Sequence, residues 1–188
     1  MYAEVHAVER LSPSLLRLEF SGGTLDEFEA SPATDAYIKA RFLPADSPLT
    51  VPFDDADVDA TDADHRPRPR RYTIRRWDPD QRVLTIDFVV HGDDGYAGSW
   101  AQRAAPGDRL QFSGPGGSFR PDPAMDWHLL VGDESAFGAI GASLEALPAG
   151  HLVIRLVYGE GDDDRELHFE GGPDWFDRLD GVAEVPAC

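Results

Sequence analysis

The fold is decided by the stretch Val83-Leu84-Thr85-Ile86-Asp87-Phe88-Val89-Val90. Every second side chain from Leu84 onwards is apolar, and Thr85 and Asp87 lie between them. A period of two places successive side chains on opposite faces of a β-strand, so this pattern predicts a strand with one buried face. The turn at residues 78–80 separates it from the strand before it and indicates a hairpin.

Other short strands are predicted from the same alternation or from flanking turn residues, at residues 14–20, 37–42, 72–74 and 109–112. Residues 44–69 hold several prolines and a run of aspartates, which predicts one long exposed loop. The glycine-rich residues 114–117 predict a tight loop, and a short helix is expected over residues 99–104. We therefore expect a mostly antiparallel β unit over residues 1–123.

A different pattern begins at residues 127–132, a short apolar run that is typical of a buried strand. Asp133 opens a predicted helix that ends near Pro148, and residues 151–158 are expected to form the next strand. A strand, a helix and a strand of these lengths predict a βαβ unit with a parallel sheet. We expect this small, truncated α/β unit to occupy residues 124–188. Its last elements are a short pair of strands, at residues 175–179 and 182–185.

The composition narrows the classes of partner. The 188 residues carry 17 basic and 35 acidic side chains, which gives a formal net charge of −18. Nucleic-acid backbones and anionic membranes would repel such a chain, so neither is expected as a partner. The single cysteine, Cys188, and the scattered histidines predict no metal site. The N-terminus shows no signal-peptide pattern and no apolar run approaches about 18 residues, so we expect a cytoplasmic location.

Two neighbouring segments have the chemistry of a dinucleotide site. Arg70, Tyr72 and Thr73 lie on one predicted strand, and the glycine-rich residues 95–101 enter a helix. A helix N-terminus of small residues exposes backbone N–H groups that can bind phosphate oxygens, and an arginine adds a charge-assisted clamp. A tyrosine can pack an aromatic ring system, and a threonine hydroxyl can hydrogen-bond a ring nitrogen. A flavin that is linked to a pyrophosphate requires this combination.

The stretch from about Val5 to Leu147 resembles the siderophore-interacting protein family, the FAD-binding ferric-siderophore reductases of the ferredoxin-reductase-like superfamily. Six pieces in the same order carry the resemblance. They are residues 70–75 (Arg-Arg-Tyr-Thr-Ile-Arg), 86–92 (Ile-Asp-Phe-Val-Val-His-Gly), 95–101 (Gly-Tyr-Ala-Gly-Ser-Trp-Ala), 106–108 (Pro-Gly-Asp), 114–117 (Gly-Pro-Gly-Gly) and 130–136 (Leu-Val-Gly-Asp-Glu-Ser-Ala).

The resemblance implies an antiparallel β-barrel that binds FAD, followed by a partial NAD(P)H-binding α/β domain. It identifies no catalytic residue. The cofactor-binding residues that it implies are Arg70, Tyr72, Thr73, Asp87, Val89, His91, Gly95, Ala97, Gly98, Ser99 and Trp100. The candidates on the nicotinamide side are Asp133, Glu134 and Ser135.

The chain also departs from the family pattern. Tyr96 stands where the family usually has proline, and Gly98 stands where it has a hydroxyl residue. The expected α/β unit is short for an NAD(P)H site, which leaves two hypotheses open. The first is a flavin-dependent oxidoreductase that passes electrons to a ferric siderophore or another small-molecule substrate. The second is a repurposed FAD-domain protein, either a biosynthetic enzyme or a ligand-binding module, that has lost NAD(P)H-dependent activity. Under either hypothesis, we expect an external electron donor or a homodimer as the partner.

Overall fold

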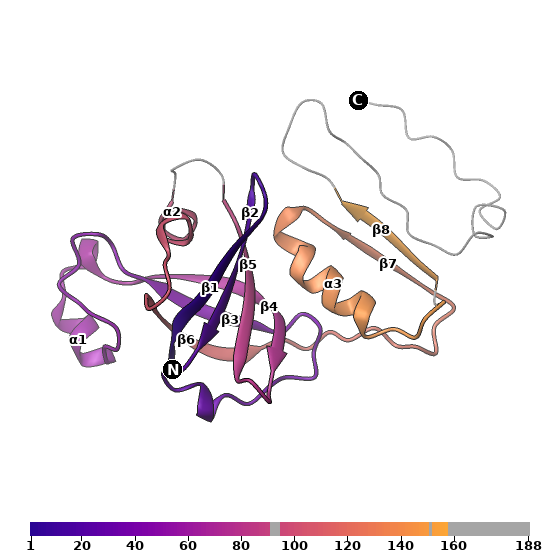
Figure 1. Ribbon diagram of the computed structural model, residues 1–188, viewed down its shortest axis with the longest axis horizontal. Coiled ribbons are helices and arrows are strands. Elements are labelled where there is room, and N and C mark those ends of the chain that lie inside the picture. The colour runs from indigo at the N-terminus through magenta and orange to yellow at the C-terminus, as the bar shows by residue number, and fades with distance from the viewer. Residues whose placement is uncertain (91–94, 151, 158–188) are drawn as a thin grey trace.

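The computed structural model describes residues 1–90 and 95–150, and the backbone of residues 152–157. Its first part is a closed barrel of six strands in the order β1-β2-β5-β4-β3-β6 (Figure 1). Every neighbouring pair is antiparallel, which confirms the predicted β-barrel. The strands are β1 (Tyr2–Ser12), β2 (Leu15–Ser21), β3 (Tyr37–Phe42), β4 (Arg68–Asp78), β5 (Val83–Val89) and β6 (Arg109–Gly116).

The alternating apolar residues fill the barrel. Leu84, Ile86 and Phe88 of β5 are fully buried, as the period of two predicts. Each such side chain contributes roughly 1.5–3 kcal/mol through its removal from water. Strand β1 was not predicted, because its register with β2 shifts at two points and its later residues are mostly exposed. Such bulges interrupt the period that the sequence pattern depends on.

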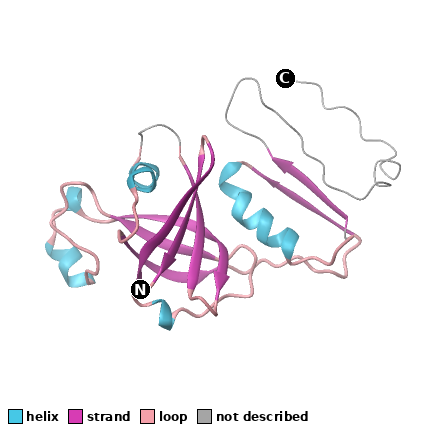
Figure 2. Ribbon diagram, in the orientation of Figure 1, coloured by secondary structure: helices cyan, strands magenta, loops and turns pink. Residues whose placement is uncertain are grey.

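The prediction of one long loop over residues 44–69 was wrong. A short helix, α1 (Asp55–Ala60), lies within it (Figure 2), and a 3-10 turn, η2 (Ala63–His65), follows. Asp54 caps the helix by accepting a hydrogen bond from the Asp57 backbone N–H, and the Asp57 side chain accepts one from the Asp54 N–H. The aspartates that suggested a solvated loop therefore form a capping box and an acidic first turn.

The prediction of a tight loop at residues 114–117 was also wrong for its first three residues, which continue strand β6. Gly116 pairs with Tyr37 of β3. A side-chain carbon at Gly116 would lie 2.7 Å from the Tyr37 ring, so glycine at this position of β6 leaves room for that ring. The glycines here therefore serve strand pairing, which a composition rule for turns cannot distinguish.

The second part is a parallel pair of strands joined by a helix, as predicted. Strands β7 (Trp127–Gly132) and β8 (Leu152–Val157) pair in parallel. The 3-10 turn η3 (Glu134–Ala136) leads into helix α3 (Phe137–Glu145) between them. The expected strands at residues 175–179 and 182–185 lie outside the described residues. The barrel ends at Gly116 and β7 begins at Trp127, and the boundary at residues 123–124 stays a prediction.

Helix α3 packs against the outer face of strand β4 (Figure 1). A side-chain carbon at Gly138 would lie 3.4 Å from the Thr73 Cβ atom, so the helix approaches the strand closely here. The Ser143 hydroxyl donates a buried hydrogen bond of 2.8 Å to the Thr34 hydroxyl of the barrel. Near the end of the helix, the Arg75 guanidinium makes two hydrogen bonds to the Glu145 carboxylate, at 2.5 and 2.9 Å. Helix α3 is thereby held against the barrel at both of its ends.

Candidate functional site

A pocket of about 330 Å³ lies where strands β4 and β5 meet the start of helix α3. Residues from both parts of the chain line it. They are Arg70, Arg71, Tyr72, Thr73, Asp87, Val89, Glu134, Ser135 and Gly138. Seven of these were predicted as cofactor or nicotinamide contacts, and the fold brings them into one place from three separate segments. Their contact with a cofactor stays a prediction.

Tyr72 connects this pocket with the barrel interior. Its ring centroid lies 4.3 Å from that of Phe88, and its ring meets Phe42 edge-on at 5.9 Å. Burial raises the pKa of the Tyr72 hydroxyl to about 12, although the nearby Arg70 charge opposes the shift. The phenol is therefore neutral at physiological pH and presents a firmly packed aromatic surface with a hydrogen-bonding end.

Arg70 is an exposed cation at the pocket rim. Its guanidinium donates to the backbone carbonyl of Pro69 at 2.9 Å, and within the described parts of the chain no carboxylate pairs with it. The adjacent Arg71 lies over the Tyr37 ring, 5.3 Å from its centroid. Arg70 is therefore free to meet an anionic ligand, whereas Arg71 already has an aromatic partner.

Asp87 differs from the other pocket residues because its carboxylate is already bound. The Arg17 guanidinium of β2 donates to both of its oxygens, at 2.8 and 2.9 Å. The Asp87 side chain is only 7% exposed, and the hydrogen bond to it raises the pKa of Arg17. Sequence reasoning missed Arg17, because only the pairing of β2 with β5 brings these two positions opposite each other.

Helix α2 (Tyr96–Arg103) follows the barrel strand β5 along the chain and begins earlier than the predicted start at residue 99. Its N-cap is Gly95, with a φ of 91° that favours glycine and with no side chain to make a capping hydrogen bond. A side-chain carbon at Gly98 would lie 3.7 Å from the Val89 carbonyl oxygen. The backbone N–H groups at the start of this helix suit an anion.

Not all the predicted cofactor contacts line the pocket. Gly95, Ala97, Gly98, Ser99 and Trp100 belong to α2 or its cap. The Trp100 ring faces the barrel core, where it meets the rings of Phe20, Phe42 and Phe88. His91 lies outside the described residues.

The nicotinamide-side candidates have distinct roles in the fold. The Asp133 carboxylate accepts hydrogen bonds from the Ser135 backbone N–H at 2.9 Å and from its hydroxyl at 2.5 Å, and these lower the pKa of Asp133. Asp133 therefore caps the turn and does not line the pocket. The Glu134 carboxylate, which does line it, accepts a hydrogen bond from the Ser14 hydroxyl of the barrel at 2.9 Å.

The residues present fit a flavin dinucleotide. The Arg68 Nε atom is buried and has no hydrogen-bond partner among the described residues, and its guanidinium lies over the ring of Tyr96, the first residue of α2. This donor and the N-terminal end of α2 suit a diphosphate, and the Tyr72 surface suits a ring system. Among the described residues, no cluster of three metal-ligating side chains is found, and no helix is long and apolar enough to cross a membrane.

The barrel and the helix–strand unit after it define the class of the protein, a ferredoxin-reductase-like FAD-binding fold. The FAD/NAD-binding domain of nitric oxide dioxygenase from Vibrio cholerae shares this fold, with a TM-score of 0.62 over 89% of this chain and 65% of that one. At 14% identity, this likeness concerns the fold alone.

The family follows from the sequence. The model of the siderophore-interacting FAD-binding domain matches residues 4–119, and the chain belongs to this family. A siderophore utilization protein from T. fusca has a similar structure, with a TM-score of 0.73 and 30% identity over 92% of this chain and 66% of that one.

Three curated relatives cover most of this chain. An uncharacterized protein of Mycobacterium tuberculosis is 42% identical over 86% of this chain and 58% of its own. The ferric vibriobactin reductase ViuB of Vibrio cholerae is 37% identical over 84% and 57%, and the NADPH-dependent ferric-chelate reductase of Escherichia coli is 35% identical over 74% and 54%. The chain thus spans little more than half the length of these relatives. Their names give no support to the alternative of a lost reductase activity.

Proposed function

We propose that this chain binds FAD between the barrel and helix α3 and serves the reduction of a ferric siderophore. The observation that carries the proposal is the pocket itself, in which Tyr72 and Thr73 of the barrel meet Glu134 and Ser135 of the second unit. Two relatives named as ferric reductases support the same chemistry. When bound, FAD supplies the electron transfer, and the protein supplies position and electrostatics.

Each residue has a defined task in this proposal. Tyr72 packs the ring system, and its neutral hydroxyl and that of Thr73 are available for hydrogen bonds to the ring edge. Arg70, Arg68 and the first turn of α2 neutralise the diphosphate. The aromatic cluster behind Tyr72 excludes water from the inner side of the pocket.

The electron donor enters from the side of the second unit in this proposal. Glu134 and Ser135 line the pocket at the turn after β7, where parallel α/β sheets commonly bind ligands. The related reductase of Escherichia coli is named as NADPH-dependent, so we propose a reduced nicotinamide nucleotide as donor. An external donor protein is the remaining option.

The test is flavin uptake by the purified chain. It should take up FAD and show flavin absorbance, and Tyr72→Ala should weaken the binding at least tenfold. Tyr2→Ala is the matched control, because Tyr2 lies on β1 beside Arg109 and does not line the pocket. A wild-type chain that takes up no FAD, or two variants that bind it equally well, would refute the proposal. Anaerobic bleaching by NADPH or NADH then identifies the donor.

A further inference from the structure

Arg17 and Asp87 form a part-buried ion pair at the wall of the pocket. They lie opposite each other on β2 and β5, and the guanidinium makes its two hydrogen bonds to both carboxylate oxygens. The side chain of Arg17 is 28% exposed and that of Asp87 only 7%. Such paired, parallel hydrogen bonds are the strongest that arginine makes with a carboxylate.

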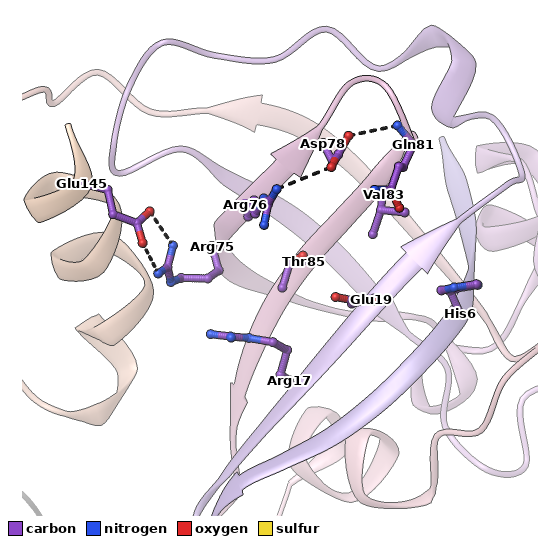
Figure 3. A pocket seen from close by; sticks show the side chains of 10 residues that line it. All are labelled: His6, Arg17, Glu19, Arg75, Arg76, Asp78, Gln81, Val83, Thr85 and Glu145. Carbon is purple, nitrogen blue, oxygen red and sulfur yellow. Dashed lines mark hydrogen bonds and ion pairs between the residues drawn. The ribbon is translucent and has the colours of Figure 1, made fainter.

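The two residues lie side by side on the outer face of the barrel wall, between two separate hollows. Asp87 lines the pocket of the proposed cofactor, whereas Arg17 lines a separate polar groove of about 490 Å³ on the outer surface (Figure 3). In this groove, Arg75 is held by Glu145 and Arg76 lies near Asp78, so these cations are committed elsewhere. Within the described residues, Arg17 is the cation that holds the Asp87 carboxylate.

The ion pair sets the net charge at the wall of the pocket. With Arg17 in place, the charge of Asp87 is compensated at 2.8 Å. Without Arg17, an ionised Asp87 would carry an unpaired charge against the pocket, and burial makes such a charge costly and favours the neutral carboxyl group. A flavin gains negative charge as it is reduced, so an unpaired carboxylate beside it disfavours the reduced form.

We propose that Arg17 is a positioning residue that holds Asp87 in a compensated ion pair and thereby sets the reduction potential of the flavin bound in this pocket. The inference rests on the proposed function, since it requires FAD at this site. It assigns a role to a residue that does not itself line the pocket and that is paired with Asp87, which does. A merely structural role for Arg17 would change stability and leave the potential where it is.

The experiment is an equilibrium redox titration of the FAD-loaded chain against a reference dye, followed by flavin absorbance. Arg17→Met should shift the midpoint potential to more negative values. A tenfold weaker binding of the reduced form relative to the oxidised form corresponds to about 30 mV for a two-electron couple. Arg17→Lys keeps the charge but loses the forked geometry, and its potential should lie between the two.

Variants of Asp87 make the test independent of the single variant Arg17→Met. Asp87→Asn leaves the Arg17 charge unopposed and should shift the potential to more positive values. The double variant Arg17→Met/Asp87→Asn has neither charge and should return the potential towards that of the wild type. Arg76→Met is the matched control, since this arginine lies on the same outer surface and its side chain is 70% exposed.

The outcomes separate the two proposals. If the wild-type chain binds no FAD, the proposed function fails. If FAD binds and Arg17→Met leaves the potential unchanged, or if the double variant is as negative as Arg17→Met, the role of Arg17 is refuted. If Arg17→Met does not fold, the positive shift of Asp87→Asn decides, and an unchanged potential in that variant overturns the proposal.

Discussion

The hydrogen bond between Ser143 and Thr34 allows a sharp test of how helix α3 is held on the barrel. The two residues are 2% and 5% exposed, and the Ser143 hydroxyl donates to the Thr34 hydroxyl at 2.8 Å. The Thr34 hydroxyl also donates to the Phe119 carbonyl oxygen at 3.3 Å. The loss of the Ser143 hydroxyl and the loss of the Thr34 hydroxyl should therefore change the free energy of unfolding by different amounts.

Ser143→Ala removes a donor, and the Thr34 hydroxyl keeps the Phe119 carbonyl as its partner. The expected loss is that of one net hydrogen bond, about 0.5–1.5 kcal/mol. Thr34→Val leaves the Ser143 hydroxyl buried without the acceptor, which costs about 1–3 kcal/mol. The Phe119 carbonyl stays satisfied in that variant, because it also accepts from the Thr34 backbone N–H at 2.8 Å.

Thermal unfolding followed by far-UV circular dichroism measures both changes. For a chain of this size, 1 kcal/mol corresponds to about 2–4 °C in Tm. We expect the order wild type, Ser143→Ala, Thr34→Val, with the last least stable. A Thr34→Val chain that is as stable as Ser143→Ala would show that the serine finds another acceptor, and the reasoning from this contact would be wrong.

Two further predictions concern the same helix. Gly138→Ala should stabilise the chain by about 0.5 kcal/mol through helix propensity. It should also weaken FAD binding, because the new methyl group enters the pocket beside Thr73. Flavin titration measures this, and Gly141→Ala should leave the FAD affinity unchanged because Gly141 does not line the pocket. Arg75 lowers the pKa of Glu145, so this pair should stabilise the chain above the ordinary glutamate value of 4.5 and lose that effect as the pH falls through the lowered pKa. Because Glu145 is 63% exposed, this stabilisation should stay below about 1 kcal/mol and shrink with added salt. Arg75→Gln should abolish the loss of stability in acid, as measured by urea unfolding at several pH values. A variant with the same acid dependence as the wild type would contradict the prediction.

The strands with a regular period were predictable from the sequence. Strand β5 alternates without interruption, and its alternating residues Leu84, Ile86 and Phe88 are all inside the barrel. Strand β1 and helix α1 were not, because bulges break the alternation of the first and the acidic composition of the second imitates a loop. Local composition cannot distinguish a capped acidic turn from a solvated loop, because the capping hydrogen bonds are seen only in the structure.

The candidate site was predictable to the extent that its residues lie in recognisable segments. Tyr72, Thr73 and Glu134 were identified from their neighbours in the sequence, and the fold brings them together. Arg17 and Arg68 were missed for different reasons. Arg17 meets Asp87 only through strand pairing, and the unpartnered nitrogen of Arg68 is visible only once its surroundings are known.

The closure of the barrel has a consequence for synthesis of the chain. Strand β6 closes the barrel between β1 and β3 and ends only at Gly116, so a nascent chain must wait with the edges of β1 and β3 open. Both edges are short, because β6 pairs with Tyr2 to Glu4 of β1 and with residues 37–41 of β3. An emerging chain therefore presents few unpaired backbone groups to its neighbours on a crowded polysome, which limits the chance of pairing between copies.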